Sequence, residues 1–125
     1  MKIKNIENFN QFKDFYNNDN FDNIIINISA SWCKPCIAIK KELHEFIENF
    51  ENNKCIFLKI DYDIIEEDED FQEYFEIKKI PYFFIYNKKS KIREFQTGNI
   101  EIIKTEINND VINNNDNSFN LSVDF

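Results

Sequence analysis

Two cysteines separated by two residues are the side chains of this sequence best suited to chemistry. Cys33 and Cys36 enclose Lys34 and Pro35, and Trp32 comes directly before them. Thiols at this spacing can close a small disulfide and open it again, which is a reversible two-electron reaction. A helix that begins at the first cysteine favours its thiolate, because the N-terminal end of the dipole is positive. The spacing therefore predicts a redox-active dithiol.

The residues on either side of the cysteines predict the elements that hold them. Ile24–Ile28 is apolar apart from Asn27, a pattern typical of a strand buried between layers of helix. From Cys33 to Phe50, apolar residues recur every three or four positions, as they do along one face of an amphipathic helix. We therefore expect the end of a central strand to deliver both thiols to the start of a helix.

The rest of the sequence alternates strand and helix patterns, which predicts an α/β domain. Further strands are expected near residues 3–6, 55–60, 82–86 and 92–96, and further helices near residues 8–16, 66–75 and 100–108. A chain of 125 residues is long enough for one domain, which we expect to span residues 1–109. Residues 110–125 are rich in asparagine and poor in apolar side chains, so we expect a mobile tail there.

Composition excludes several kinds of partner. The net charge of −8 and the lack of a basic stripe argue against nucleic acid and anionic membranes. No apolar stretch approaches the roughly 20 residues of a membrane-spanning helix, and Met1–Asn5 leads into a polar segment and not into a secretory signal. Three cysteines are too few, and odd in number, for a disulfide scaffold. We expect a cytoplasmic monomer.

The order of elements and the motif together resemble the thioredoxin family, from roughly residue 3 to residue 108. The resemblance depends on Trp32 before the cysteines, Pro35 between them, Ile80-Pro81 ahead of a later strand, and the position of Gly98, the only glycine. It implies a thioredoxin fold, with a central mixed sheet of four to five strands flanked by about four helices. It also implies a protein disulfide oxidoreductase.

Within this resemblance the two cysteines have separate roles. Cys33, at the helix start, is the expected nucleophile and forms a mixed disulfide with the substrate. Cys36, one turn further into the helix, is the expected resolving thiol, which attacks Cys33 and releases the reduced product. No cofactor is expected beyond the Cys33–Cys36 disulfide. The expected partners are protein disulfides and a flavoenzyme of the thioredoxin-reductase type, which resets the dithiol.

Six further residues are expected to shape the site and bind the substrate: Trp32, Lys34, Pro35, Ile80, Pro81 and Gly98. Trp32 offers a flat apolar flank, and Pro35 stiffens the first helical turn. The resemblance implies that the Ile80–Pro81 bond is cis, that Pro81 faces the disulfide, and that the neighbouring main chain pairs with the substrate. It also implies that Gly98 borders the same surface.

Three residues depart from the family pattern. Lys34 replaces a usual glycine and adds a cation beside Cys33, which should stabilise the thiolate and make the reduction potential less negative than the roughly −270 mV of thioredoxin. Asn27 stands where thioredoxins bury an acid that takes the proton of the resolving cysteine. Phe57 falls where many bacterial members place a lysine beside that acid. We expect water or another group to serve as the base, and resolution to be slowed.

Two other interpretations of the cysteines remain open. The pair could be half of a zinc site, but only His44 and Cys55 remain as further ligands, and they lie on different elements. We expect Cys55 to be a small buried residue and His44 to be solvent-exposed. The alternative functions are an isomerase or oxidase-like enzyme, disfavoured by the missing secretory signal and motif histidine, and a thioredoxin-fold binding module or redox-regulated partner with weak turnover.

Overall fold

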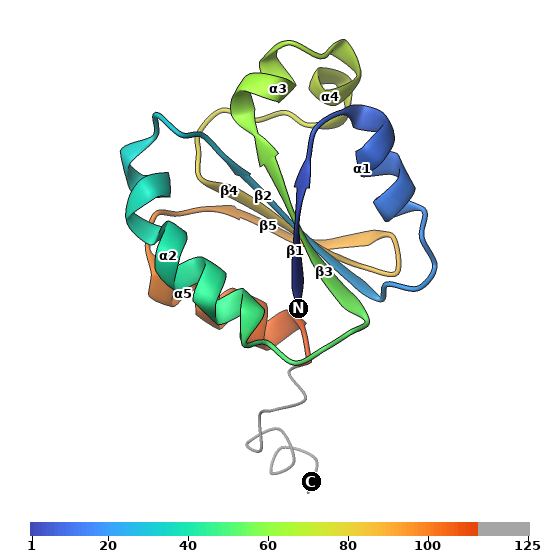
Figure 1. Ribbon diagram of the computed structural model, residues 1–125, viewed down its shortest axis with the longest axis vertical. Helices are drawn as coiled ribbons and strands as arrows, with labels where there is room; N and C mark the ends of the chain where they lie inside the picture. Colours follow the sequence, from blue (N-terminus) through green and yellow to red (C-terminus); the bar gives the residue numbers. More distant parts are fainter. Residues whose placement is uncertain (113–125) are drawn as a thin grey trace, which may run out of the picture.

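The part of the protein that the structure describes is a five-stranded sheet with helices on both faces (Figure 1). The computed structural model describes residues 1–112. The strand order is β1-β3-β2-β4-β5, with β1, β3 and β2 parallel, β4 antiparallel to β2, and β5 antiparallel to β4. The elements are β1 (Lys2–Ile6), α1 (Phe9–Tyr16), β2 (Asn23–Ser29), α2 (Lys34–Glu48), β3 (Cys55–Asp61), α3 (Tyr62–Glu66), α4 (Glu69–Tyr74), β4 (Tyr82–Asn87), β5 (Ser90–Gln96) and α5 (Ile100–Asp110).

Strand β2 occupies the centre of the sheet and ends at the cysteines. Six of its seven residues are buried, because β3 and β4 flank it and helices cover both of its faces. Asn27 stands opposite Lys59 of β3 and Phe83 of β4. Residues that are paired across neighbouring strands project to the same face, so Asn27 and Lys59 share a face of the sheet.

Helix α2 begins at the motif because Cys33 and Pro35 both suit the start of a helix. Cys33 is the N-cap, and Pro35 lies in the first turn, where its missing N–H is not needed. Cys36, Ile39, Leu43 and Ile47 are buried at helical spacing. The predicted strand, loop and amphipathic helix are confirmed within two residues at each end.

The sheet separates two apolar layers. We call the layer under α1, α3 and α4 the aromatic face, and the layer under α2 and α5 the α2–α5 face. The aromatic face holds Phe12, Phe71, Phe75, Phe84 and Tyr86, together with aliphatic side chains from the central strands. The α2–α5 face holds Ile25, Ile39, Leu43, Ile47, Phe57, Ile103 and Ile107, among others.

The predicted α/β class, with a mixed sheet of four to five strands flanked by helices, is confirmed; residues 1–112 contain five helices where about four were expected. The additional helix, α3, is five residues long, too short to show a 3.6-residue period. Asp61 caps it by accepting a hydrogen bond from the backbone N–H of Asp63. The acidic block is therefore divided: Glu66 ends α3, and Asp68 caps α4.

The packed part of the chain extends slightly past the expected boundary at residue 109. Asp110 is the last residue of α5, and Val111 is 3% exposed within the apolar layer of the α2–α5 face. The remainder of the asparagine-rich segment, residues 113–125, lies outside the described residues. Within residues 1–112, no helix combines the length and the apolar character needed to cross a bilayer.

Candidate active site

Cys33 and Cys36 lie together at the N-terminus of α2, beyond the end of β2. Both are free thiols, and each is 7% exposed. The backbone N–H of Cys36 donates a hydrogen bond to Cys33 Sγ at 3.4 Å, and Cys33 Sγ lies 4.0 Å from the carbonyl oxygen of Ile80. A sulfur at a helix N-cap that accepts a backbone N–H is well placed to carry negative charge.

The second thiol is held in its protonated form. Burial, followed by the hydrogen bond and charge of Cys33, raises the pKa of Cys36 to about 12. Only a thiolate attacks a disulfide. Cys36 must therefore lose its proton before it can take part in exchange.

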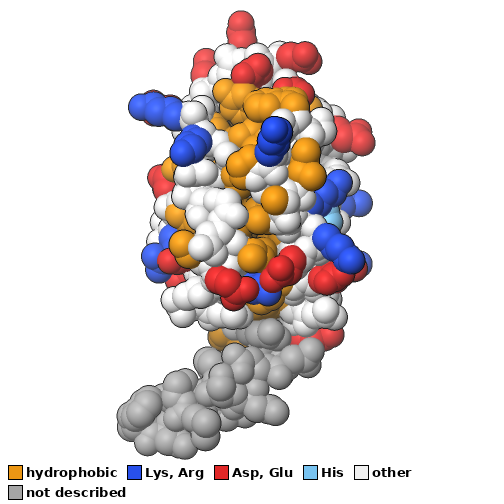
Figure 2. Space-filling model, turned by 90° about the vertical axis from the view of Figure 1, so that its left-hand side faces the viewer, with side chains coloured by type: hydrophobic (Ala, Val, Ile, Leu, Met, Phe, Trp, Pro, Cys, Tyr) orange, Lys and Arg blue, Asp and Glu red, His pale blue; other side chains and the backbone are white. Residues whose placement is uncertain are grey.

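The rim of the site carries an exposed aromatic ring held in place from α3. Trp32 is 59% exposed, and its indole N–H donates to Asp63 Oδ1 at 3.0 Å. Its ring meets Tyr62 edge-on, with centroids 6.2 Å apart. Figure 2 shows hydrophobic side chains gathered in a band on the side of the molecule where α2 lies. Asp63, which the sequence did not single out, thus orients the expected docking residue.

Two segments from the second half of the chain complete this surface. The Ile80–Pro81 peptide bond is cis, and Ile80 packs against the cluster that contains both thiols. Gly98 lies against the first turn of α2, where an added Cβ would come within 3.1 Å of Pro35 Cβ. Lys34 is exposed beside them. All the residues expected to border the motif therefore lie at this end of the sheet.

Asn27 is buried beneath the pair and is satisfied by the main chain. It is 2% exposed, and its Nδ2 donates to the carbonyl oxygen of Tyr82 at 3.3 Å. Together with Cys36 it lines a cavity of about 430 Å³ between α2 and the strands β1, β2 and β3. The amide thus occupies the wall behind the resolving thiol.

The same cavity contains a cation that sequence reasoning missed. The expectation that Phe57 takes the place of the lysine beside the buried acid is wrong, because Phe57 pairs with Ile25 in the sheet register, whereas Lys59 pairs with Asn27. Lys59 and His44 are both half-buried, and Lys59 Nζ lies 3.0 Å from His44 Nε2. The prediction that His44 is solvent-exposed is wrong, because α2 turns this side chain toward β3. Two signals were available in the sequence. Lys59 lies two residues after Phe57, so on a strand both side chains project to the same face. His44 lies eight residues after Cys36, so on a helix the two side chains project to similar sides.

The third cysteine is separate from this site. Cys55 is 2% exposed at the start of β3, and its Sγ lies 3.7 Å from Asn23 Oδ1. Burial raises the pKa of the Cys55 thiol to about 11, as suits an unreactive core residue. Among residues 1–112, no three His, Cys, Asp or Glu side chains are grouped so that they could hold a metal ion.

Comparison with known proteins gives a consistent result. The sequence model of the thioredoxin family matches residues 3–111. Thioredoxin from Ovis aries is 31% identical over 106 residues, covering 85% of this chain and 96% of the relative, and thioredoxin from Homo sapiens gives the same values.

Solved structures agree with the fold. The reduced thioredoxin pre-protein of Schistosoma mansoni superposes with a TM-score of 0.75 at 20% identity, covering 89% of this chain and all of that one. A thioredoxin of Plasmodium falciparum gives a TM-score of 0.73 at 22% identity, covering 86% of this chain and 99% of that one.

Proposed function

The chain belongs to the thioredoxin family and is a protein disulfide reductase, and from this premise we propose that Cys33 and Cys36 carry the reaction. The observation that supports this assignment is the arrangement of the two sulfurs. Cys33 caps α2 and accepts the N–H of Cys36, while Cys36 lies behind it with a pKa of about 12. One thiol is thus ready to attack, and the other stays protonated until it is needed.

In the first step, the thiolate of Cys33 attacks one sulfur of a substrate disulfide. A mixed disulfide forms, and the other substrate sulfur leaves as a thiolate that takes a proton from solvent. In the second step, Cys36 attacks Cys33, the mixed disulfide breaks, and the second substrate sulfur leaves. The substrate is reduced by two electrons, and the Cys33–Cys36 disulfide is formed.

The substrate docks on the rim around Cys33. Trp32 provides exposed apolar area, and Gly98 lies so close to Pro35 that a side chain there would crowd the first turn of α2. The main chain at Ile80 and Pro81, beside Cys33, pairs with the extended segment that carries the substrate disulfide. The rim is thus suited to a protein strand.

Thioredoxins in general act on protein disulfides and are reduced by a thioredoxin reductase. For this chain, a flavoenzyme of that type restores the dithiol, and no cofactor beyond the Cys33–Cys36 disulfide is required. We also propose a cytoplasmic monomer, since three cysteines are too few, and odd in number, for the disulfide scaffold of a secreted domain.

Insulin reduction with a thioredoxin reductase and its reductant tests the assignment. We expect Cys33→Ser to abolish turnover. Cys36→Ser should stop turnover after one step and accumulate a mixed disulfide that mass spectrometry detects. Cys55→Ser is the matched control, since it removes a buried thiol outside the site, and it should retain activity within about twofold.

The same turnover measurement distinguishes a reductase from a binding module. A module that merely retains its disulfide would bind partners through the rim around Trp32 and Pro81 without catalysing insulin reduction. Wild-type turnover no higher than that of Cys33→Ser would contradict the assignment of Cys33.

A further inference from the structure

Two lysines, Lys78 and Lys79, come directly before the main chain that is expected to pair with a substrate. We propose that they and Lys34 make the rim around Cys33 selective for disulfides in acidic protein segments, which carry Asp or Glu beside the cysteine. The inference deepens the proposed function and rests on it, since it names the class of protein that Cys33 attacks. It runs against the net charge of −8, which for the chain as a whole disfavours acidic partners.

The first support is the position of the three cations. Lys34 is the residue after Cys33 and is exposed in the first turn of α2. Lys78 and Lys79 are exposed in the loop that leads to Ile80, whose carbonyl oxygen lies 4.0 Å from Cys33 Sγ. Consecutive Cα atoms are about 3.8 Å apart, so each lysine begins within two residues of atoms that a docked substrate contacts.

The second support is that the acids nearest these lysines already have partners. Glu76 lies 3.6 Å from Lys78 in an exposed ion pair, and Asp63 accepts the indole N–H of the rim tryptophan. Within residues 1–112, neither Lys34 nor Lys79 forms an ion pair. These two cations are therefore available to a carboxylate of the substrate.

The third support is the uneven distribution of charge along the chain. Residues 61–76 hold nine of the 23 acidic residues and no Lys or Arg, which leaves 14 acidic residues against 15 Lys and Arg elsewhere. The net negative charge thus comes from the segment that contains α3 and α4. This segment meets the rim at Asp63, whereas the lysines belong to the start of α2 and to the loop before Ile80.

The surface shows the same separation. In Figure 2, Lys and Arg side chains border the hydrophobic band on both sides, and many of the Asp and Glu side chains in view gather at its upper and lower ends. At physiological ionic strength the Debye length is about 8 Å, so exposed charges further away are largely screened. A carboxylate held at the rim therefore interacts mainly with the lysines beside it and not with the net charge of the chain.

Three synthetic peptide disulfides test the proposal on the full chain. Each is a homodimer of one short extended sequence, linked through its single cysteine, with two glutamates, two glutamines or two lysines beside that cysteine. The reduced protein reacts with an excess of each peptide in a single turnover, and acid quenching with mass spectrometry follows the loss of the Cys33 and Cys36 thiols. No reductase is present, so the rates report recognition and exchange at this site alone.

The intrinsic reactivity of the peptides is measured separately. Glutamates beside a cysteine raise the pKa of the thiol that leaves, which slows exchange with any attacking thiolate. Dithiothreitol also attacks through a thiolate but has no rim, so its rate with each peptide gives the background. The preference of the protein is its rate relative to dithiothreitol, compared between the glutamate and the glutamine peptide.

We expect the wild type to prefer the glutamate peptide about three- to fivefold at about 0.1 M ionic strength, because an exposed ion pair changes a binding constant by up to about fivefold. The lysine peptide should be disfavoured to a similar extent. The preference should fall below about twofold at about 0.5 M, where the charges are screened. Lys79→Gln should lower it about twofold, Lys79→Glu should abolish it, and Lys79→Arg should retain it.

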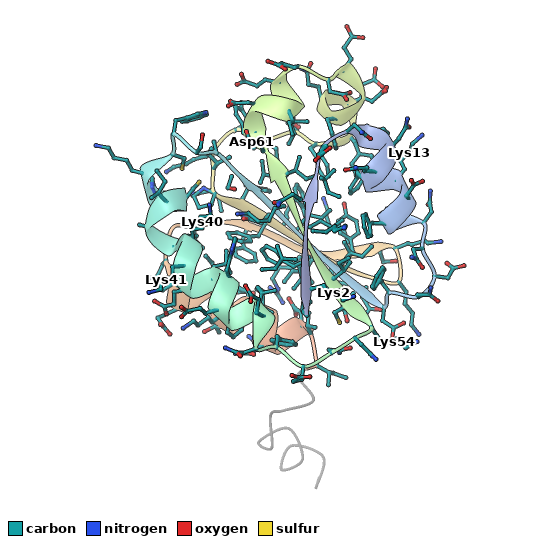
Figure 3. The ribbon with its side chains drawn as sticks, viewed as in Figure 1. Lys2, Lys13, Lys40, Lys41, Lys54 and Asp61 are labelled. Carbon is teal, nitrogen blue, oxygen red and sulfur yellow. The ribbon has the colours of Figure 1, made fainter. Side chains whose placement is uncertain are left out.

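Lys54→Gln is the matched control. It removes one exposed lysine from the turn before β3, and Figure 3 shows Lys54 and Asp61 at opposite ends of that strand. Since β2 runs parallel to β3 and pairs Ser29 with Asp61 just before the cysteines, Lys54 lies at the end of the sheet away from Cys33. This variant should keep the wild-type preference.

The outcomes separate the inference from the function on which it rests. A wild type without a preference for the glutamate peptide would overturn the inference, as would an undiminished preference in both Lys79→Gln and Lys79→Glu. An equal loss of rate on all three peptides in these variants would also overturn it, because it indicates that Lys79 supports the loop and does not select charge. A wild type no faster than Cys33→Ser on every peptide would instead contradict the proposed function.

Discussion

The two faces of the sheet are built from different kinds of side chain. On the aromatic face, Phe12 is fully buried and its ring meets those of Phe71, Tyr74 and Phe75 at centroid distances of 5.1–6.2 Å. On the α2–α5 face, mostly aliphatic packing gives way at the active-site end to polar groups, Asn27 and Lys59. The aromatic face thus stabilises the fold, whereas the α2–α5 face contains buried polar side chains beside a thiol that must ionise.

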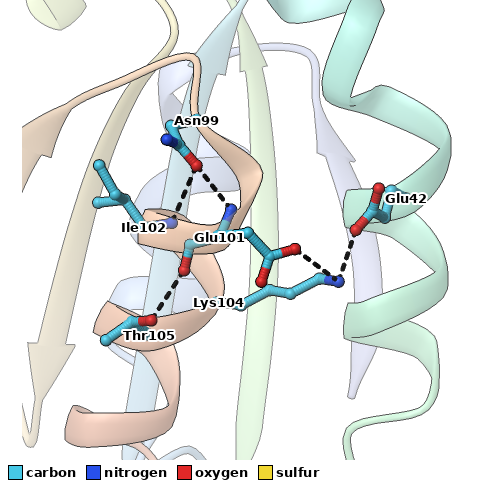
Figure 4. A network of polar contacts seen from close by, with 6 residues as sticks. All are labelled: Glu42, Asn99, Glu101, Ile102, Lys104 and Thr105. Carbon is cyan, nitrogen blue, oxygen red and sulfur yellow. Dashed lines mark hydrogen bonds and ion pairs between the residues drawn. The ribbon is translucent and has the colours of Figure 1, made fainter.

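Surface contacts between α2 and α5 add little to this second layer. Lys104 Nζ of α5 lies 2.6 Å from Glu42 Oε2 of α2, and Asn99 caps α5 nearby (Figure 4). The Glu42 side chain is 52% exposed, and exposed ion pairs contribute about 0–1 kcal/mol. The position of α2 therefore depends mainly on buried side chains such as Ile103 and Ile107.

The largest expected effect concerns the aromatic face. Phe12→Ala should lower the free energy of unfolding by about 3–5 kcal/mol, because it leaves a cavity among several rings. Urea denaturation measures the loss, and the rate at which Cys33 reacts with Ellman's reagent, measured without urea, should stay within about twofold of wild type. Ile102→Ala, at a site 46% exposed, should change stability by less than about 0.5 kcal/mol. A Phe12→Ala loss below about 1.5 kcal/mol would contradict this division between the faces.

At the active-site end of the sheet, a side chain at position 98 should impair docking of a protein substrate without changing the reactivity of the thiols. Gly98→Val places atoms against Pro35, so we expect insulin reduction to fall about tenfold, equivalent to about 1.4 kcal/mol of activation free energy. The small Ellman's reagent needs less of the rim and should react within about twofold of wild type. If both substrates lose the same factor, Gly98 acts on the thiols and not on docking.

Two buried asparagines of β2 allow a matched test of the polar side chains that lie beneath the dithiol. Asn27→Asp introduces a carboxylate that can accept the proton of Cys36, and we expect resolution to become about threefold faster near pH 7. With Ellman's reagent in excess, the second release of thionitrobenzoate, which does not depend on reagent concentration, measures this rate. Asn23→Asp is the control, since Asn23 is also buried on this face, is bonded to a β4 carbonyl, and lies at the opposite end of the strand. Unchanged resolution in Asn27→Asp would show that the amide does not limit the second step.

Titrating side chains of the two faces should also limit stability at different pH values: His44 of the α2–α5 face contributes to the acidic limit, whereas the buried tyrosines of the aromatic face add to the alkaline loss that Cys36 and Cys55 begin above about pH 9. Burial lowers the pKa of His44 from 6.5, so below about pH 6.5 the unfolded chain binds more protons and stability falls with falling pH. Burial raises the pKa of Tyr74 and Tyr86 above 10.0, so above about pH 10 the folded chain keeps protons that the unfolded chain loses, and stability falls with rising pH.

Urea denaturation across the pH range checks both limits. His44→Gln should flatten the acidic side of the stability profile and leave the alkaline side unchanged. Tyr74→Phe should flatten the alkaline side alone. If either variant changes the opposite limit, the titrations do not divide between the faces in this way.

The smallest expected effect concerns the exposed cation within the motif. Lys34→Gln should make the reduction potential about 10–20 mV more negative, since a solvated charge stabilises the Cys33 thiolate only weakly. Equilibration with glutathione at known ratios measures the potential, for which we expect a wild-type value less negative than about −270 mV. Lys41→Gln should not change it. A less negative potential for Lys34→Gln would reverse the sign of the proposed effect.

Local patterns predicted most elements but not the shortest one. The apolar spacing from Cys33 onward identified α2, and the run Ile24–Ile28 identified β2, because burial on one or both faces leaves a period in the sequence. Helix α3 was missed, since five residues cannot display a helical period and its cap, Asp61, also ends a strand. An aspartate at the end of a strand can equally begin a turn, so it does not by itself predict a helix.

Neighbours along the chain were enough to identify the dithiol, the strand and helix that carry it, and the α/β class. The meeting of Lys59 and His44 behind Cys36, and the contact of Gly98 with Pro35, came only from the tertiary structure. Those contacts join residues 15 and 63 positions apart, which no periodicity relates. They arise when buried faces pack, and packing brings a half-buried cation into the cavity behind a thiol whose ionisation is opposed by burial.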